Sequence, residues 1–420
     1  MKRSNNSASL FEIEIEKLVY GGSGLGRFRG KVVFVPYSAP GDRLLVRPVR
    51  QKKDYIRAEI ANILDPGPGR ANPECPHFGR CGGCHWQHLE YPRQVEAKLR
   101  ILEEICRHRF PQTCNIPVSM KACPQPVGYR SRARVQVRHE EGFGRSVGFY
   151  RTGSHSVESI ERCPLLRPPL DRALDSLRGI NSGTDFGTDI REIDIAGSCE
   201  ENSWTAAPVG NENASKDAYP GKEKDTGTTE NLMKRKVGGF MYSVSASVFF
   251  QANDFMISDL VQLVRELAGD SPQNAAVDLF AGVGLFSLPL AFHFKTVAAI
   301  ENSPAASRLC SENARAAGAD SLRTVCADVK RWLESTLSSD MPDIDLILLD
   351  PPRTGAGADV MEKIRALSPE TILYVSCDPQ TLCRDLSCIS PEEYRIDRIE
   401  GLDMFPQTYH FETVVRLKRC

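Results

Sequence analysis

The chain has 420 residues, 41% of them hydrophobic and 25% charged, which is ordinary for a soluble globular protein of two or three domains. No segment approaches the ~18 consecutive apolar residues of a membrane helix, and the first ten residues lack the apolar core of a signal peptide. We therefore expect a cytoplasmic protein without a membrane partner, and nothing indicates an obligate protein partner. Fourteen cysteines are too sparse for a disulfide scaffold, so metal-binding, catalytic or buried thiols are expected.

Residues 8–66 have the pattern of short alternating strands. Phe11, Ile13 and Ile15 would share one face while the glutamates between them share the other. Turns rich in glycine and proline separate the strands, which predicts a small OB-like β-barrel. The net charge of the chain is only −1, but its first 60 residues carry twelve lysines and arginines against six acids. This excess favours RNA binding, although a solvated basic surface explains it equally well.

A middle region is predicted from residues 71–92 and 121–247. One of its strands carries arginines at alternate positions, which favours a track for RNA phosphates over a merely solvated face. Residues 181–236 are rich in Gly, Asn, Thr and Lys and poor in aliphatic residues, so we expect a flexible insertion there. The arginines of the alternating row are Arg130, Arg132, Arg134 and Arg138.

The middle region also contains a cysteine cluster in "CPHFGRCGGCHW", with the spacing C-x5-C-x2-C, and a further cysteine in "ERCPLL". Four thiolates can hold an iron–sulfur cluster or a zinc ion. Because zinc ribbons prefer paired C-x2-C knuckles, the spacing favours an iron–sulfur cluster, with zinc or simple burial as the alternatives. The candidate metal ligands are Cys75, Cys81, Cys84 and Cys163.

The remaining segments, 93–120 and 248–420, have the pattern of an α/β fold. Residues 94–110 have apolar side chains at helical spacing, and apolar runs such as "AAVDLFA", "TVAAIE" and "TILYVSCD" alternate with helical stretches further on. This alternation predicts a doubly wound, mostly parallel sheet with crossover helices. Ligands of such sheets bind at the carboxyl ends of the strands, so the residues that end each run are candidates for the site.

A cofactor site is predicted where three successive strands end in acids. "VDLFAGVGLF" places Asp278 before two glycines that allow a tight turn, and Glu301 and Asp328 end the next two runs. Glu301 would accept hydrogen bonds from ribose hydroxyls, and Asp328 would face an adenine. A dinucleotide is the alternative, but its third fingerprint glycine is absent because Ser287 occupies that position. S-Adenosylmethionine, which has no pyrophosphate, fits better.

The last strand ends carry groups suited to covalent chemistry. Asp350 in "LILLDPPRTG" precedes two rigid prolines and either docks a planar substrate or simply caps its strand. Cys377 in "SCDP" ends the following run, and a helix beginning at Asp378 would place positive potential beside the thiol and lower its pKa. Glu412 stands at the start of a terminal strand and is unremarkable by itself.

Together, "DLFAGVG", "DPPR", "SCDP" and "HFET" in this order resemble the bacterial RNA uracil-5-methyltransferases, specifically their iron–sulfur branch that acts on 23S ribosomal RNA. The resemblance implies a C-terminal Rossmann-like S-adenosylmethionine methyltransferase domain, an N-terminal TRAM domain and a small middle domain with a 4Fe–4S cluster on the four cysteines. It covers nearly the whole chain. The sequence departs from the family at the 181–236 insertion and at Leu285, a loop position that is often asparagine in relatives.

The resemblance also implies roles for individual residues. Cys377 would attack carbon 6 of a uridine, which makes carbon 5 nucleophilic enough to accept a methyl group. Glu412 would then remove the proton from carbon 5 so that the cysteine can leave. The pocket for the cofactor and the base would contain Gln251, Phe280, Glu301, Asp328 and Asp350.

Three functions from different classes are to be distinguished. Uracil-5-methylation of RNA leads, with ribosomal RNA favoured over transfer RNA by analogy with the family. An amino-group methyltransferase is second because an Asp-Pro-Pro pocket also accepts hydrogen bonds from an exocyclic amine, and such an enzyme has no need of Cys377. A non-enzymatic iron–sulfur protein that binds RNA is third, and it would not bind S-adenosylmethionine.

Overall fold

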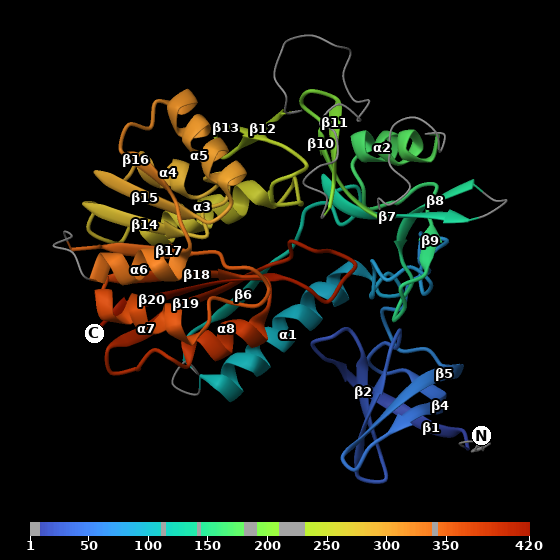
Figure 1. The fold of residues 1–420 in the computed structure, drawn as a ribbon. Helices are drawn as coiled ribbons and strands as arrows, with labels where there is room; N and C mark the ends of the chain where they lie inside the picture. The colour runs from blue at the N-terminus through green and yellow to red at the C-terminus, as the bar shows by residue number, and fades with distance from the viewer. Residues whose placement is uncertain (1–8, 111–114, 141–143, 180–190, 210–231, 338–342) are drawn as a thin grey trace, which may run out of the picture.

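The computed structural model describes residues 9–110, 115–140, 144–179, 191–209, 232–337 and 343–420. These residues form an N-terminal barrel, a middle β region and a large α/β region. The barrel lies at one end of the molecule, and the middle sheet lies beside the α/β region (Figure 1). Among the described helices, none is long and apolar enough to cross a membrane.

The barrel is closed by five strands in the order β1-β2-β3-β5-β4. Ile13 and Ile15 of β1 point into its core, while the glutamates between them are exposed, so the predicted alternation and barrel are confirmed. Gly26 is required in β2 because a Cβ there would lie 2.2 Å from the carbonyl oxygen of Glu14. The strands are β1 (Phe11–Leu18), β2 (Gly24–Phe28), β3 (Lys31–Val35), β4 (Arg43–Gln51) and β5 (Tyr55–Asp65).

The middle region is a five-stranded antiparallel sheet, β11-β10-β7-β8-β9, with helix α2 packed on it and the hairpin β12-β13 beside it. The expected flexible insertion over 181–236 is wrong for 192–208 and 233–236, which form strands; residues 180–190 and 210–231 lie outside the described residues. The strands form because Ile193 and Ile195 alternate into the core under α2. The elements are β7 (Arg132–Glu140), β8 (Gly144–Tyr150), β9 (Val157–Ser159), α2 (Pro168–Gly179), β10 (Glu192–Ser198), β11 (Ser203–Pro208), β12 (Met233–Val237) and β13 (Phe240–Val244).

The α/β region is built on an eight-stranded sheet in the order β16-β15-β14-β17-β18-β20-β19-β6. The first five of these strands are parallel, and β20 runs antiparallel to β18. The strands are β6 (Val118–Lys121), β14 (Ala275–Leu279), β15 (Thr296–Glu301), β16 (Leu322–Cys326), β17 (Leu346–Leu349), β18 (Thr371–Ser376), β19 (Tyr394–Leu402) and β20 (Glu412–Arg419).

Helices cover both faces of this sheet (Figure 1). Helices α3, α4 and α5 pack on one face, and α1, α6, α7 and α8 pack on the other, so each face has its own hydrophobic core. The predicted doubly wound architecture is confirmed. The helices are α1 (Tyr91–Arg109), α3 (Ile257–Ala268), α4 (Ser287–Ala291), α5 (Pro304–Ala317), α6 (Val329–Leu337), α7 (Ala358–Leu367) and α8 (Pro379–Leu386).

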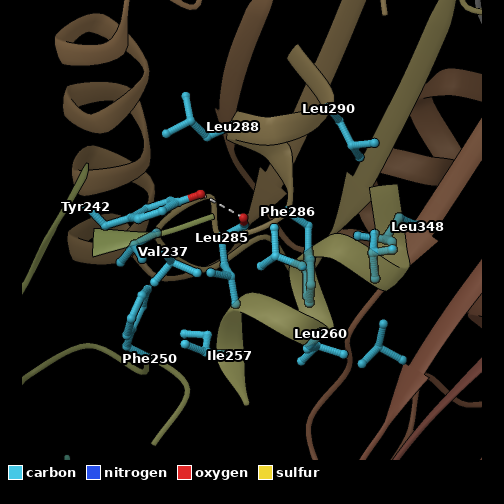
Figure 2. Packing of buried hydrophobic residues seen from close by; sticks show 14 of the residues in the cluster. Val237, Tyr242, Phe250, Ile257, Leu260, Leu285, Phe286, Leu288, Leu290 and Leu348 are labelled. Carbon is cyan, nitrogen blue, oxygen red and sulfur yellow. Dashed lines mark hydrogen bonds between the residues drawn. The ribbon is translucent and has the colours of Figure 1, made fainter. Parts of the chain in front are cut away.

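The core on the face covered by α3, α4 and α5 packs against the glycine-rich loop after β14. Figure 2 shows the Tyr242 hydroxyl donating a hydrogen bond to the carbonyl oxygen of Leu285, at 3.0 Å. The Leu285 side chain is 7% exposed and belongs to the same cluster as Phe250 and Ile257. A leucine at this loop position is therefore a core residue that anchors the loop.

Candidate active site

The candidate nucleophile and base lie side by side at the carboxyl edge of the sheet. Strands β18 and β20 pair antiparallel with Ser376 opposite Thr413. Because Cys377 follows Ser376 and Glu412 precedes Thr413, the register carries these two residues onto facing positions. Asp350 follows β17, the parallel neighbour of β18, so it reaches the same edge. The fold thus gathers three predicted site residues from segments far apart in the chain.

The thiol of Cys377 is partly buried in an acidic environment. Burial, together with the nearby carboxylates of Glu412, Asp350 and Asp378, raises its pKa to about 12, and Arg353 partly opposes the shift. The prediction that the following helix lowers this pKa is therefore wrong. Free thiols titrate near 8.5, so Cys377 is protonated at neutral pH in the free protein.

The α8 N-terminus cannot lower the pKa of Cys377 because Asp378 caps it. The Asp378 carboxylate accepts hydrogen bonds from the backbone N–H groups of Gln380, at 2.8 Å, and Thr381, at 3.3 Å. These are the donors that would otherwise project positive potential beyond the helix. Their partner is a carboxylate adjacent in sequence to the thiol, so the cap brings a negative charge there.

Glu412 and Asp350 form a buried acidic pair. Glu412 is 2% exposed, and its Oε2 has no hydrogen-bond partner among the described residues. Burial and the neighbouring Asp350 hold the pKa of Glu412 well above its usual range, and burial raises the pKa of Asp350 to about 7. The buried Gln251 amide donates to Asp350 Oδ2 at 3.4 Å. Near neutral pH the pair therefore retains at least one proton, ready for exchange with a bound molecule.

Arg353 supplies the positive charge of this edge. Its side chain is exposed, and it lowers the pKa of both Cys377 and Glu412 against the larger effect of burial. No salt bridge involves it in the described parts of the chain. The sequence shows it only as the last letter of "DPPR", where an arginine after two prolines has no distinctive signal.

The predicted cofactor loop has the backbone of a ligand-binding turn. Phe280 adopts a φ of 63°, an uncommon conformation for a residue other than glycine, and Gly284 a φ of 88°. A Cβ on Gly284 would lie 2.7 Å from Cys310 Sγ, so the close packing against α5 requires glycine. Glu301 accepts hydrogen bonds from the N–H of Gly282, at 2.9 Å, and of Ser303, at 2.7 Å, which fixes its carboxylate beside the loop.

The other predicted acids flank this loop. Asp328 is exposed at the start of α6, where it accepts a hydrogen bond from the N–H of Arg331 at 3.1 Å. Asp278 is buried, and burial raises its pKa to about 7 although the hydroxyl of Ser287 donates to it. Ser287, the residue in place of a third glycine, thus anchors the acid that precedes the loop. The Asp350 charge also raises the pKa of Asp278, so the loop and the Cys377 edge are contiguous.

Comparison with known proteins identifies the family. The tRNA (Uracil-5-)-methyltransferase family matches residues 225–420, and the TRAM domain of tRNA (uracil(54)-C(5))-methyltransferase matches residues 11–68. A Synechocystis protein described as an uncharacterized RNA methyltransferase is 31% identical over 100% of this chain and 99% of its own length. A relative of the same description from Thermosynechococcus vestitus is 30% identical over 97% of both chains. The chain belongs to the tRNA (uracil-5-)-methyltransferase family.

The enzyme also resembles a solved structure over almost its whole length. The crystal structure of Pyrococcus abyssi tRNA (uracil-54, C5)-methyltransferase, in complex with S-adenosyl-L-homocysteine, matches with a TM-score of 0.71 and 22% identity. The match covers 96% of this chain and 100% of that one, and it shows the shared fold. The predicted α/β methyltransferase fold with an N-terminal TRAM barrel is confirmed, and so is the prediction of an RNA methyltransferase over a non-enzymatic protein.

The four predicted metal ligands of the methyltransferase line one cavity of about 170 Å³. Burial, with a contribution from the other thiols, raises the pKa of Cys84 to about 12 and that of Cys163 to about 11. Within the described ranges, no three His, Cys, Asp or Glu side chains form a group that could hold a metal ion. The structure therefore gathers the four thiols around one cavity without forming a recognised metal site. The four are Cys75, Cys81, Cys84 and Cys163.

The alternating arginines of the enzyme make hydrogen bonds within the protein. Arg134 makes a bidentate pair with Asp194, at 2.9 and 3.0 Å. Arg132 donates to the backbone carbonyl oxygens of Ser245 and Ala246, directly after β13. Arg138 donates to the carbonyl oxygen of Val137. The Arg134 side chain is 52% exposed despite its pairing with Asp194, and the phosphate track stays a prediction.

A buried polar network holds the loop that leads into Glu412, and sequence reasoning missed it. Gln94 on α1 exchanges two hydrogen bonds of 2.9 Å with Gln407, which adopts a φ of 68°. One turn later, Lys98 donates to Asp403 at 2.5 Å, and both side chains are fully buried. The spacing of four residues places Gln94 and Lys98 on one face of the helix. The partners lie about 300 residues away, so no local pattern announces them.

Proposed function

We propose that the enzyme methylates carbon 5 of a uridine in RNA with S-adenosylmethionine as the methyl donor. The observation that carries this proposal is the facing position of Cys377 and Glu412 at the sheet edge, with Asp350 beside them. A uracil-5-methyltransferase needs a nucleophile and a general base that both reach the same uracil ring. An amino-group methyltransferase has no use for the thiol, so the pairing favours carbon 5.

The residues of the edge account for each bond that changes. The Cys377 thiol first releases its proton to solvent, and the thiolate then forms an S–C bond at carbon 6 while the electron pair of the carbon 5–carbon 6 double bond forms an enolate. When bound, S-adenosylmethionine supplies an electrophilic methyl group to the resulting nucleophilic carbon 5. Glu412 then takes the proton from carbon 5, and its electrons restore the ring double bond as the S–C bond breaks. The thiolate returns, and the product is 5-methyluridine.

The buried acids and amide would orient the base during these steps. Gln251 and Asp350 lie at hydrogen-bond distance from each other, so together they present donors and acceptors to the polar edge of a uracil. With a pKa of about 7, Asp350 can hold a proton toward a ring oxygen that gains charge in the enolate. The target base must leave its RNA stack to reach this edge.

The glycine-rich loop and its flanking acids would hold the cofactor. Phe280 stands at the strained turn, Glu301 is fixed beside the loop, and Asp328 is exposed at the start of α6. Glu301 retains free lone pairs for ribose hydroxyls because each oxygen accepts only one backbone hydrogen bond. Asp328 lies one strand further along, where the adenine is expected.

The test uses RNA that contains 5-fluorouridine, incubated with the enzyme and S-adenosylmethionine. Fluorine cannot leave as a proton, so the reaction stops at the covalent adduct, which migrates as a protein–RNA band on a denaturing gel. We expect the band with wild type and with Cys388→Ala, which removes a thiol at the end of α8. Cys377→Ala should give no band. An adduct of wild-type intensity from Cys377→Ala would refute the assignment of the nucleophile.

We propose further that the four cysteines hold a 4Fe–4S cluster with a structural role. The cavity supports this because all four cysteines line it and because burial raises the pKa of Cys84 and Cys163, so these thiols ionise more readily beside a cationic group. Protein purified without oxygen should be brown and contain about four iron atoms per chain. A colourless protein with one zinc ion per chain would establish the zinc alternative.

We propose 23S ribosomal RNA as the substrate, with transfer RNA as the second candidate. Support comes from the resemblance of the combined barrel and cysteine motif to the ribosomal branch, whereas the matched family and the solved relative are described for tRNA. Mapping 5-methyluridine in RNA from a strain that lacks the gene decides between them. Loss of the modification from a tRNA alone would overturn the ribosomal assignment.

A further inference from the structure

We propose that four aromatic rings beside Cys377 form a stacking site for a second base of the RNA, one that flanks the target uridine. This inference rests on the proposed function and extends it from one recognised base to two. The catalytic steps described above use none of these rings. They are Tyr20, His85, Tyr409 and His410, and each is partly exposed.

The rings form one continuous cluster around Tyr409. Its centroid lies 4.1 Å from that of His410, with the planes inclined by 35°, and 4.7 Å from that of His85. Tyr20 meets it edge-on at 5.4 Å. Burial lowers the pKa of His410 to about 3, so its ring is neutral and needs no counter-ion. Neutral, partly exposed rings of this kind are the platforms on which proteins stack unpaired bases.

The cluster lies next to the reactive thiol. After burial, Asp378 is the largest cause of the raised pKa of Tyr20, and Cys377 itself contributes to that shift. Arg353 acts on the Tyr409 hydroxyl as well as on the Cys377 thiol. A base on the rings would therefore belong to the RNA segment that holds the target base at the sheet edge.

The platform is preformed because the three segments that carry the rings are joined by hydrogen bonds to main-chain carbonyl oxygens. The carbonyl oxygen of Gln407 accepts from the N–H groups of His85, at 2.9 Å, and Trp86, at 3.0 Å. The Trp86 indole N–H donates to the carbonyl oxygen of Gly22 at 3.0 Å, which joins the barrel turn to the same point. Binding a base thus requires little ordering of the rings, which favours affinity.

The surroundings of Tyr20 favour a single strand of RNA as the occupant. Tyr20 lines two hollows: one of about 500 Å³ contains Arg50, Arg57 and Glu59 of the barrel, and one of about 340 Å³ contains Arg109, Gln380 and Glu104, whose charge is paired with Lys17. Gln380 follows Cys377 by three residues, so the smaller hollow borders the start of the helix that follows the thiol. Aromatic rings interleaved with arginines suit bases and phosphates of an unpaired strand.

The experiment is ultraviolet cross-linking of full-length enzyme to total RNA from a strain lacking the gene, followed by mass spectrometry of nucleotide-bearing peptides. We expect cross-links on the peptide that contains Tyr409 and on the barrel turn with Tyr20. Tyr409→Leu removes the ring and should raise the KM for RNA about tenfold, the range measured for loss of one stacked base. Tyr409→Phe keeps the ring and should restore most of it. Phe292→Leu, which changes a remote exposed aromatic residue, is the matched control.

The outcomes separate this inference from the proposed function. Cross-links at Tyr409 without a 5-fluorouridine adduct would retain the platform and refute the nucleophile. An adduct without such cross-links, and with an unchanged KM for Tyr409→Leu, would refute the platform and retain the function. If Tyr409→Phe is as impaired as Tyr409→Leu, the hydroxyl rather than stacking matters, and the inference is wrong.

Discussion

The sheet edge and the cysteine cavity both hold thiols whose pKa is raised first of all by burial, yet their neighbours differ. Cys377 is alone among carboxylates, with Arg353 as the opposing charge. Cys84 and Cys163 lie among other thiols, and Arg130 opposes the shift at Cys163. Desolvation makes a thiolate costly at both places. Under the proposed function, the Cys377 thiol ionises only transiently at the edge, whereas a permanently bound cationic cluster would offset the cost of the thiolates in the cavity.

This contrast is consistent with different proposed roles for Cys377, the nucleophile, and for the four cavity cysteines, the ligands of a cluster. Burial and the carboxylates beside Cys377 keep its thiol protonated in the free protein. Four thiols that share one cavity repel one another as thiolates unless iron or another cation neutralises them. Changes to individual residues of the two places test this division.

The largest expected effect is on turnover in Glu412→Gln. Glutamine cannot take the proton from carbon 5, so methylation should slow by about 10²- to 10⁴-fold, the range of general acid–base catalysis. The S–C bond can still form, and therefore a methylated adduct should accumulate on ordinary uridine RNA. Denaturing gels with radiolabelled RNA measure it. Glu392→Gln, at an exposed acid far from the edge, is the control. An unchanged turnover number for Glu412→Gln would mean that another group is the base.

The next effect concerns the cavity and is seen in iron content and stability. Cys84→Ser should lose most of the iron and destabilise the fold by about 4 kcal/mol or more, because loss of a bound metal is among the few single changes of that size. Iron analysis and thermal unfolding measure the two quantities. Cys199→Ser changes a thiol of the same region outside the cavity and should alter neither. Equal iron in both variants would show that Cys84 is not a ligand, and the absence of iron from wild type as well would show that the cavity holds no cluster.

Sequence patterns predicted the sheet edge well because the carboxyl ends of parallel strands lie at the same edge of the sheet. Cys377 and Asp350 each end a buried apolar run, and runs of that kind can be located without a structure. The influence of Asp378 was misjudged because a helix start predicts positive potential, whereas its capping carboxylate reverses the sign at the neighbouring thiol. The strands of 192–208 were missed because short polar alternations resemble loops in composition.

Long-range partners were beyond sequence reasoning for a physical reason. Gln94 meets Gln407, and Lys98 meets Asp403, only after the sheet has formed, so neither pair has a local signature. The same holds for Tyr20, which follows the first barrel strand in sequence but contacts Tyr409 in the loop before Glu412.

A third prediction concerns pH and only the thiol at the edge. The pKa of Cys377 is raised to about 12. At a pH below that value, each increase of one pH unit therefore raises the thiolate fraction about tenfold. The initial rate of adduct formation with 5-fluorouridine RNA should therefore rise steadily from pH 7 to pH 9.5. Rapid sampling limits alkaline RNA cleavage. A plateau that begins near pH 7 would show that the thiol ionises easily, and the contrast between edge and cavity would be lost.

The smallest expected effect separates charge from capping at Asp378. Asp378→Asn keeps an oxygen that can accept from the first turn of α8 but removes the negative charge beside Cys377. The pKa of the thiol should fall, so adduct formation at pH 7.5 should become roughly threefold to tenfold faster, with little change in stability. Asp378→Ala removes charge and cap together, and it should show the same acceleration with a loss of about 1 kcal/mol in unfolding free energy. If both variants slow the reaction, the carboxylate is needed in the reaction itself, since a role limited to raising the thiol pKa permits only acceleration.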